Sequence, residues 1–273
     1  MKFSLVLVSK RSRLAFVAAV LSLLAVPVAV RASNLNVVYY TVANGDKDAY
    51  KLCCGVSDNE VLPSLGLNGL PVLNTAMTGA PMPTDIDADG ELTYWSPALS
   101  NGGPGGTSDV VQTATGLVSL PYTNNAFFTP NGTGSHDGSP NGFQAAYFYG
   151  TLDAPTAEKI SFSVSSDDMA FVYLDGTVVC NDGGVHGATA VPCTTSTVSA
   201  GDHTLQIFYV DLDPVAAVLD FSITTTGVTT SGSAVPEPGT WTLFGTGLLV
   251  LLVAARRRRI FYAHSTSRNS SGV

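Results

Sequence analysis

Two adjacent aspartates, Asp167 and Asp168, stand between two segments with strand-like sequences. Neighbouring carboxylates repel each other, so the pair costs stability unless a cation or several N–H donors offset the charge. Calcium prefers carboxylate and carbonyl oxygens, and Asp211 or Asp213 can complete its ligand shell from a later loop. The pair therefore predicts a calcium site, and the alternative is a solvated turn.

A second acidic run, Asp85-Ile86-Asp87-Ala88-Asp89-Gly90, is similar to the first half of an EF-hand calcium loop, with glycine at the sixth position. The twelfth position is Ser96 instead of a bidentate glutamate, and no flanking helix is predicted. Asp85, Asp87 and Asp89 are therefore a second calcium candidate, and the alternative is an acidic turn.

Catalytic patterns are not evident in the sequence. It has no Gly-x-Ser-x-Gly nucleophile elbow, and nothing marks two of its many aspartates as the opposed carboxylates of a glycosidase. We therefore expect a non-enzymatic protein, and a glycosidase is the less favoured alternative.

The elements that must position these residues are strands. Residues 36–42 and 144–152 are rich in β-branched and aromatic residues, whereas Ile160, Phe162 and Val164 alternate with serines, as expected for a strand with one buried face. Residues 169–174 are apolar on both faces, and Asp175-Gly176 is a hairpin turn pair. Further strand faces follow in residues 205–209 and 219–223, so the sequence predicts an all-β, antiparallel sandwich.

The N-terminus predicts a signal peptide over residues 1–32. A basic stretch precedes an apolar run over residues 14–30, and Ala32 ends a small-residue cleavage site, with Ala29 as the alternative. Signal peptidase is the partner that this pattern implies. We therefore expect the mature chain to be exported.

The C-terminus combines three features: Pro236-Glu237-Pro238, a 15-residue apolar run over 241–255, and four arginines, Arg256, Arg257, Arg258 and Arg259. A spanning helix needs about 20 residues, so 241–255 predicts a short transmembrane helix. The positive-inside rule places the arginines and the polar tail 260–273 in the cytoplasm. Residues 224–234, rich in Thr, Ser and Gly, predict a linker before this segment.

Four cysteines in an exported chain predict disulfides. Cys180 and Cys193 bracket a glycine-rich loop and are the natural pair. The partners of Cys53 and Cys54 stay open, because a bridge between neighbours and cross-pairing with the other two are both compatible with the sequence. The sequence contains no Cys-x-x-Cys pair, the spacing that is typical of zinc sites.

Charge excludes one class of partner. The whole chain has a formal charge of −8, but residues 33–255 combine only three lysines with all 21 acidic residues, which gives −18. Such a segment does not bind nucleic acid by neutralising phosphates. It suits calcium, and it also serves solubility.

The C-terminal segment, residues 235–259, resembles the PEP-CTERM sorting signal of Gram-negative bacteria that make exopolysaccharide. The resemblance rests on Pro236, Glu237, Pro238, the apolar run and the arginine cluster. It implies export across the inner membrane, transient anchoring by the helix, and cleavage near the Pro-Glu-Pro triplet by an exosortase, a membrane-embedded cysteine protease. The mature protein would then reach the cell surface or the extracellular matrix.

Residues 162–188 and 198–223 resemble the fibro-slime domain, which belongs with the protective-antigen-type (PA-fourteen) β-sandwiches. The resemblance rests on four short motifs: Asp167-Asp168, Asp175-Gly176, Gly183-Gly184-Val185-His186 and Ala200-Gly201-Asp202-His203. It implies a sandwich over 33–223. In sugar-binding relatives the paired aspartates hold calcium, often across a cis peptide, and the calcium holds sugar hydroxyls.

These observations predict a calcium-stabilised surface or extracellular-matrix protein with an adhesive or structural role in an exopolysaccharide biofilm. The alternative is a calcium-dependent lectin that binds exopolysaccharide or another glycan.

Overall fold

The computed structural model describes residues 33–124, 142–214 and 216–232, and the regular structure in these ranges is entirely β-strand. The predicted signal peptide at 1–32, the sorting segment at 235–259 and the tail at 260–273 lie outside the described residues. The chain divides after Ala32, and all described residues belong to the second unit.

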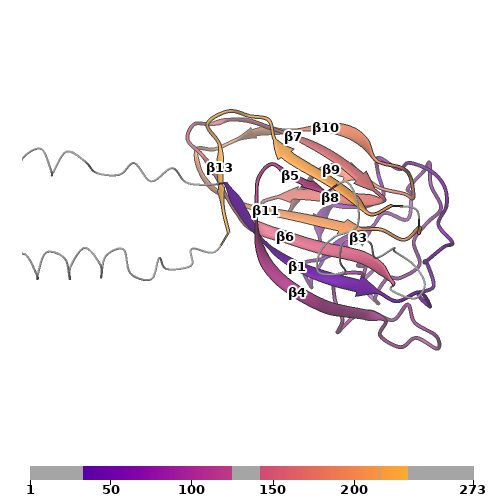
Figure 1. Ribbon diagram of the computed structural model, residues 1–273. Coiled ribbons are helices and arrows are strands. Elements are labelled where there is room, and N and C mark those ends of the chain that lie inside the picture. Colours follow the sequence, from indigo (N-terminus) through magenta and orange to yellow (C-terminus); the bar gives the residue numbers. More distant parts are fainter. Residues whose placement is uncertain (1–32, 125–141, 215, 233–273) are drawn as a thin grey trace, which may run out of the picture. The chain divides into compact units, whose positions relative to one another are not determined.

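Two antiparallel sheets are formed, which confirms the predicted all-β, antiparallel fold (Figure 1). The larger sheet has the order β3 (Pro71–Leu73), β2 (Val61–Leu65), β9 (Thr177–Asp182), β8 (Met169–Leu174), β11 (Gly201–Val210), β6 (Phe143–Ala154), β1 (Asn34–Val42) and β4 (Val110–Ser119), and β13 (Thr229–Ser231) also pairs with β6. The smaller sheet has the order β10 (Thr189–Val198), β7 (Glu158–Asp167), β12 (Val218–Ile223) and β5 (Tyr122–Asn124).

The β8–β9 hairpin turns at the predicted dipeptide. Asp175 and Gly176 both have positive φ, 50° and 71°, and Leu174 pairs with Thr177 across the turn. Two-residue hairpin loops require this backbone, which aspartate tolerates and glycine adopts freely. The dipeptide therefore fixes the register in which β8 meets β9.

The first core lies between the two sheets. Ile160, Phe162 and Val164 of β7 are buried in it, while Ser161 and Ser163 on the same strand are only half-buried. Alternate residues of a strand point to opposite faces, so this confirms the predicted one-sided strand. Residues of β1, β6, β8, β11 and β12 complete the core from both sheets.

A second core covers the other face of the larger sheet. All six residues of β8 are buried, because Ala170 and Val172 belong to the first core whereas Phe171 and Tyr173 belong to the second. The long connections of the N-terminal half supply the covering side chains. One of them, Trp95, donates its indole N–H to the Tyr209 carbonyl at 2.7 Å.

The folded part extends past the predicted domain end at residue 223. Thr229–Ser231, assigned to a linker by composition, form β13 and pair with β6 at Asp153, Leu152 and Thr151. Short Thr-rich segments can complete a ladder through the backbone alone, so composition does not distinguish them from a linker.

A disulfide joins Cys180 of β9 to Cys193 of β10, with Cα atoms 5.4 Å apart. Since β9 and β10 belong to different sheets, this bridge ties the two layers together. Cys53 and Cys54 are paired with each other, which is one of the alternatives that the sequence leaves open.

Peptide mapping without reductant should recover the peptides of Cys180 and Cys193 as one linked product that separates on reduction. The close Cα atoms and the oxidising compartment both favour the bond. Free thiols at both positions in the exported protein would contradict this pairing.

Candidate functional site

The adjacent aspartates lie where β7 ends and β8 begins. Asp167 is the last residue of β7, and the peptide bond between it and Asp168 is cis. Asp211 follows β11 directly, and the register pairs Val210 with Met169 at the start of β8. The carboxylate oxygens of Asp167, Asp168 and Asp211 consequently lie within 4.8 Å of one another. The structure thus brings together three of the four residues expected from the sequence.

Asp213, the fourth expected residue, is half-buried beside this group without belonging to it. Its backbone N–H donates to Asp211 Oδ1 at 3.2 Å. Its negative charge contributes to raising the pKa values of Asp167 and Asp168. Asp213 therefore adds charge at the edge of the group.

Backbone donors orient the Asp168 carboxylate. The N–H of His186 donates to Oδ1 at 3.1 Å, and the N–H of Leu212 donates to Oδ2 at 2.8 Å. Burial raises the pKa of Asp168 to about 7, and the charges on Asp167 and Asp213 act in the same direction. Burial also raises the pKa of Asp167. The site therefore disfavours three negative charges unless a cation offsets them.

The donor set fits calcium. Asp167, Asp168 and Asp211 offer only oxygen ligands, which hard cations prefer. Two ligands of one calcium ion lie about 2.3–2.6 Å from it, so they can be up to about 5 Å apart, and the group meets this limit. These three carboxylates would hold the ion, which would supply the missing positive charge.

A buried ion pair lies next to this group. The Nε2 of His186 is 3.3 Å from Asp182 Oδ1, and the hydrogen bond with Asp182 raises the pKa of His186 to about 9. Glu60 is fully buried nearby, and burial raises its pKa to about 8. The sequence alone does not indicate that Glu60 lies near this group, because only the folding of the long connection between β1 and β2 brings it there.

The structure divides the second acidic run between two groups. Asp85 is buried beside Asp46 and Asp109, whereas Asp87 and Asp89 gather with Glu91. Asp87 Oδ1 accepts the N–H groups of Asp89 and Glu91, both at 2.9 Å, so it closes a local turn. The three aspartates expected in one EF-hand-like loop therefore do not face a common point.

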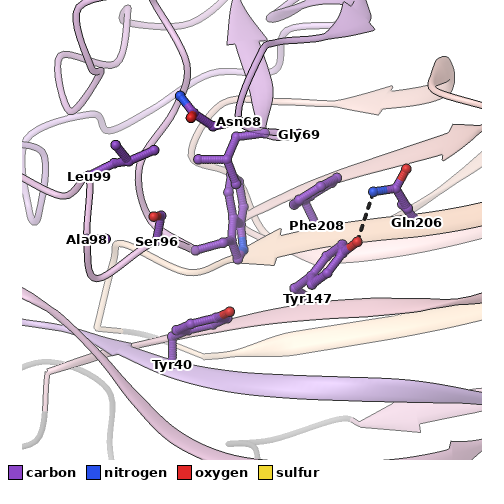
Figure 2. A pocket seen from close by; sticks show the side chains of 11 residues that line it. Tyr40, Asn68, Gly69, Ser96, Ala98, Leu99, Tyr147, Gln206 and Phe208 are labelled. Atoms are coloured by element: carbon purple, nitrogen blue, oxygen red, sulfur yellow. Dashed lines mark hydrogen bonds between the residues drawn. The ribbon is translucent and has the colours of Figure 1, made fainter.

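A groove of about 480 Å³ opens on the outer face of the larger sheet. Figure 2 shows Tyr40, Tyr147, Gln206 and Phe208 on the strands, and the loop residues Ser96, Ala98 and Leu99 opposite them. The Tyr147 ring stacks on Phe208, with centroids 4.8 Å apart, and Gln206 donates to its hydroxyl at 2.8 Å.

A second hollow of about 310 Å³ continues past Tyr147 and Gln206. Tyr149 lines it, stacks on Tyr147 with centroids 5.2 Å apart, and is 37% exposed. Aromatic faces flanked by a few polar groups are typical of small-molecule sites. The sequence did not single out these residues, because their strand pattern looks the same as that of a core.

The C-terminal segment is outside the described residues, and its sequence combines Pro236-Glu237-Pro238, an apolar run and an arginine cluster. Residues 234–259 match the PEP-CTERM protein-sorting motif. The PEP-CTERM motif confirms the predicted sorting signal and indicates an exported protein that an exosortase sorts to the cell surface. Within the described ranges, no helix is long and apolar enough to cross a membrane. The predicted helix at 241–255 lies beyond those ranges.

Several solved structures are similar to parts of the chain. This chain spans 11% of the length of the β-glucosidase from Kluyveromyces marxianus. The match covers 31% of this chain, with 10% identity and a TM-score of 0.27. A PA14 sugar-binding domain from an RTX adhesin is 14% identical over 73% of this chain and 95% of that domain, with a TM-score of 0.33. The epithelial adhesin 9 A domain from Candida glabrata is 9% identical over 72% and 85%, with a TM-score of 0.35.

At these TM-scores, none of the likenesses carries an argument about function. No curated protein sequence matches the chain significantly.

Proposed function

We propose that this chain is an adhesive or structural component of the cell surface or extracellular matrix, stabilised by calcium. The observation that carries the proposal is the group of Asp167, Asp168 and Asp211, whose carboxylates converge from two neighbouring strand ends. The PEP-CTERM motif supports the location. In this proposal the chain crosses the inner membrane of a Gram-negative bacterium and is held by residues 241–255 until the exosortase cuts it.

Calcium would bind between a strand end of the smaller sheet and a strand end of the larger sheet. Asp167 ends a strand of the smaller sheet, and Asp211 follows a strand of the larger sheet. An ion shared by these residues would join the two layers at this edge. The protein's own groups orient the ligands, since the N–H groups of His186 and Leu212 hold both oxygens of Asp168.

The second candidate function is a calcium-dependent lectin, and the aromatic groove favours it. Phe208 lies on β11, three residues before Asp211, which directly follows this strand, so the groove begins about 10 Å along the chain from the calcium group. A sugar has apolar C–H faces and hydroxyl edges, which match stacked tyrosine rings beside the Gln206 amide. A glycan held at the calcium group could therefore extend along β11 towards Tyr147 and Tyr149.

Retention on the producer's own exopolysaccharide separates the two functions. If the protein is a lectin, the full chain in detergent should be retained in calcium and released by chelator. In calcium, Asp168→Asn should be retained as poorly as the parent is in chelator. Tyr149→Ala should weaken retention about two- to tenfold, because aromatic contacts contribute about 0.5–1.5 kcal/mol beyond burial.

Leu117→Ala is the matched control, because this side chain is also exposed but lies on β4 outside both hollows. A chain that calcium stabilises but that no glycan retains would favour the structural component. Turnover of the glycan would contradict both functions and favour a glycosidase.

A further inference from the structure

Three buried aspartates, Asp46, Asp85 and Asp109, come from separate segments of the N-terminal half of the chain and lie close together. Asp46 comes shortly after β1, and Asp109 directly precedes β4. Because Val42 of β1 pairs with Val110 of β4, the register brings these two segments together, and the N–H of Ala43 donates to the Asp109 carbonyl at 2.9 Å. Asp85 arrives from the long connection between β3 and β4. The carboxylate oxygens of the three lie within 4.8 Å of one another.

Burial leaves some of these oxygens without donors. Asp46, Asp85 and Asp109 are 1%, 0% and 7% exposed. Asp46 Oδ1 accepts the N–H of Asp48 at 2.6 Å, and Asp109 Oδ1 accepts the Ser100 hydroxyl. No hydrogen-bond donor among the described residues reaches Asp46 Oδ2 or Asp109 Oδ2. A buried oxygen of this kind costs free energy unless something binds it.

Asp48 shows how the same turn satisfies a carboxylate that is purely structural. Its two oxygens accept the backbone N–H of Thr84 at 2.8 Å, the N–H of Asp85 at 2.7 Å and the Tyr94 hydroxyl at 2.8 Å, and the Thr84 hydroxyl donates as well. Such a supply of donors is absent for Asp46 Oδ2 and Asp109 Oδ2 within the described chain. Structural burial therefore accounts for Asp48 but not for the three-aspartate group.

The charge of the group matches a divalent cation. Lys47 is the cation paired with it, with Nζ 3.4 Å from Asp85 Oδ1 and 2.7 Å from Asn101 Oδ1. When all three carboxylates are ionised, they and the one ammonium leave two negative charges, which a divalent cation would neutralise. The ligands are all oxygens, which suits calcium and not zinc, and their spacing is compatible with one shared ion.

We propose that Asp46, Asp85 and Asp109 form a second divalent-cation site of the calcium class, separate from Asp167, Asp168 and Asp211. The ion would tie the connection between β3 and β4 to the β1–β4 pair. Gly102 lies against the site: a Cβ at this position would be 2.0 Å from Asp46 Oδ2 and 2.8 Å from Asp109 Oδ2. Only glycine leaves this space to an ion.

Counting bound calcium by equilibrium dialysis of the full chain in detergent tests the site. The parent should bind at this site and at the first one, so Asp168→Asn isolates the second ion. The double variant Asp168→Asn with Asp85→Asn should lose that ion. The matched control combines Asp168→Asn with Asp87→Asn, which changes a neighbouring carboxylate outside the group, and it should retain the ion.

Lys47→Met keeps the test independent of folding defects. Removing the ammonium leaves the three carboxylates without their positive partner, so calcium should bind more tightly, about tenfold or more. An unfolded variant cannot give tighter binding. Absence of calcium from Asp168→Asn, or loss of the ion through Asp87→Asn and not through Asp85→Asn, would overturn the proposal. Neither result would contradict the proposed function, because the first site has already been removed by Asp168→Asn in these variants.

Discussion

Chelating calcium should lower the melting temperature of the full chain, and Asp168→Asn should remove the part of this effect that belongs to the first site. A ligand that binds only the folded state stabilises it by RT ln(1 + [L]/Kd), about 2.7 kcal/mol at a hundredfold excess over Kd. Asp168 contributes one of three converging carboxylates and lies at the junction of β7 and β8. Replacing it by asparagine keeps the shape and removes the charge that calcium needs.

Thermal scans in calcium and in chelator measure this effect. Asp87→Asn is the control for the acidic run and should keep the full calcium-dependent rise, whereas Asp85→Asn should remove the share of the second site. Equal melting temperatures of the parent in calcium and in chelator would refute calcium binding at both groups. They would also refute the calcium-dependent lectin.

The same experiment should depend on pH in a defined direction. Burial raises the pKa of Asp168 from 3.8 to about 7, so between these values the folded chain holds a proton that the unfolded chain has released. In chelator, stability should therefore fall as the pH rises from about 4 to about 7. Calcium requires the deprotonated carboxylate, so the calcium-dependent rise in melting temperature should grow over the same interval. A rise that shrinks towards neutral pH would contradict this role of Asp168.

Local chemistry made some features predictable from the sequence. Asp175-Gly176 specifies a turn because few residue pairs accept positive φ. The sequence of β8 is typical of a central strand because its residues are apolar on both faces. Asp167-Asp168 stands out because adjacent carboxylates repel each other unless a cation or N–H donors offset their charge. Each of these inferences depends only on neighbouring residues.

Long-range arrangement could not be predicted in this way. β4 is mostly exposed and has no regular alternation of apolar and polar residues, and it becomes a strand through its backbone pairing with β1. Residues 92–95 have a strand-like composition but form a bridge and a turn, because Tyr94 and Trp95 cover the outer face of the sheet. Asp46 and Asp109 meet Asp85 only after β1 and β4 have paired, so spacing along the chain linked Asp85 to Asp87 and Asp89 instead.

Replacing Glu237 by alanine should leave an uncut, membrane-held precursor. The PEP-CTERM motif at residues 234–259 places Glu237 in the triplet that the exosortase would recognise. The apolar run at 241–255 and the arginine cluster, which are unchanged in this variant, should continue to hold the chain in the membrane. Immunoblots of fractionated cells would show a larger species in the membrane fraction, whereas the parent yields a shorter, surface or released form.

Glu158→Ala is the matched control, because it removes a glutamate from the start of β7, far along the chain from the motif, and should leave sorting unchanged. Identical size and location of the Glu237→Ala variant and the parent would contradict recognition by an exosortase. The last described strand, β13, ends at Ser231, before the motif begins. The uncut precursor should therefore bind calcium as the parent does, and this measurement separates a defect in sorting from a defect in folding.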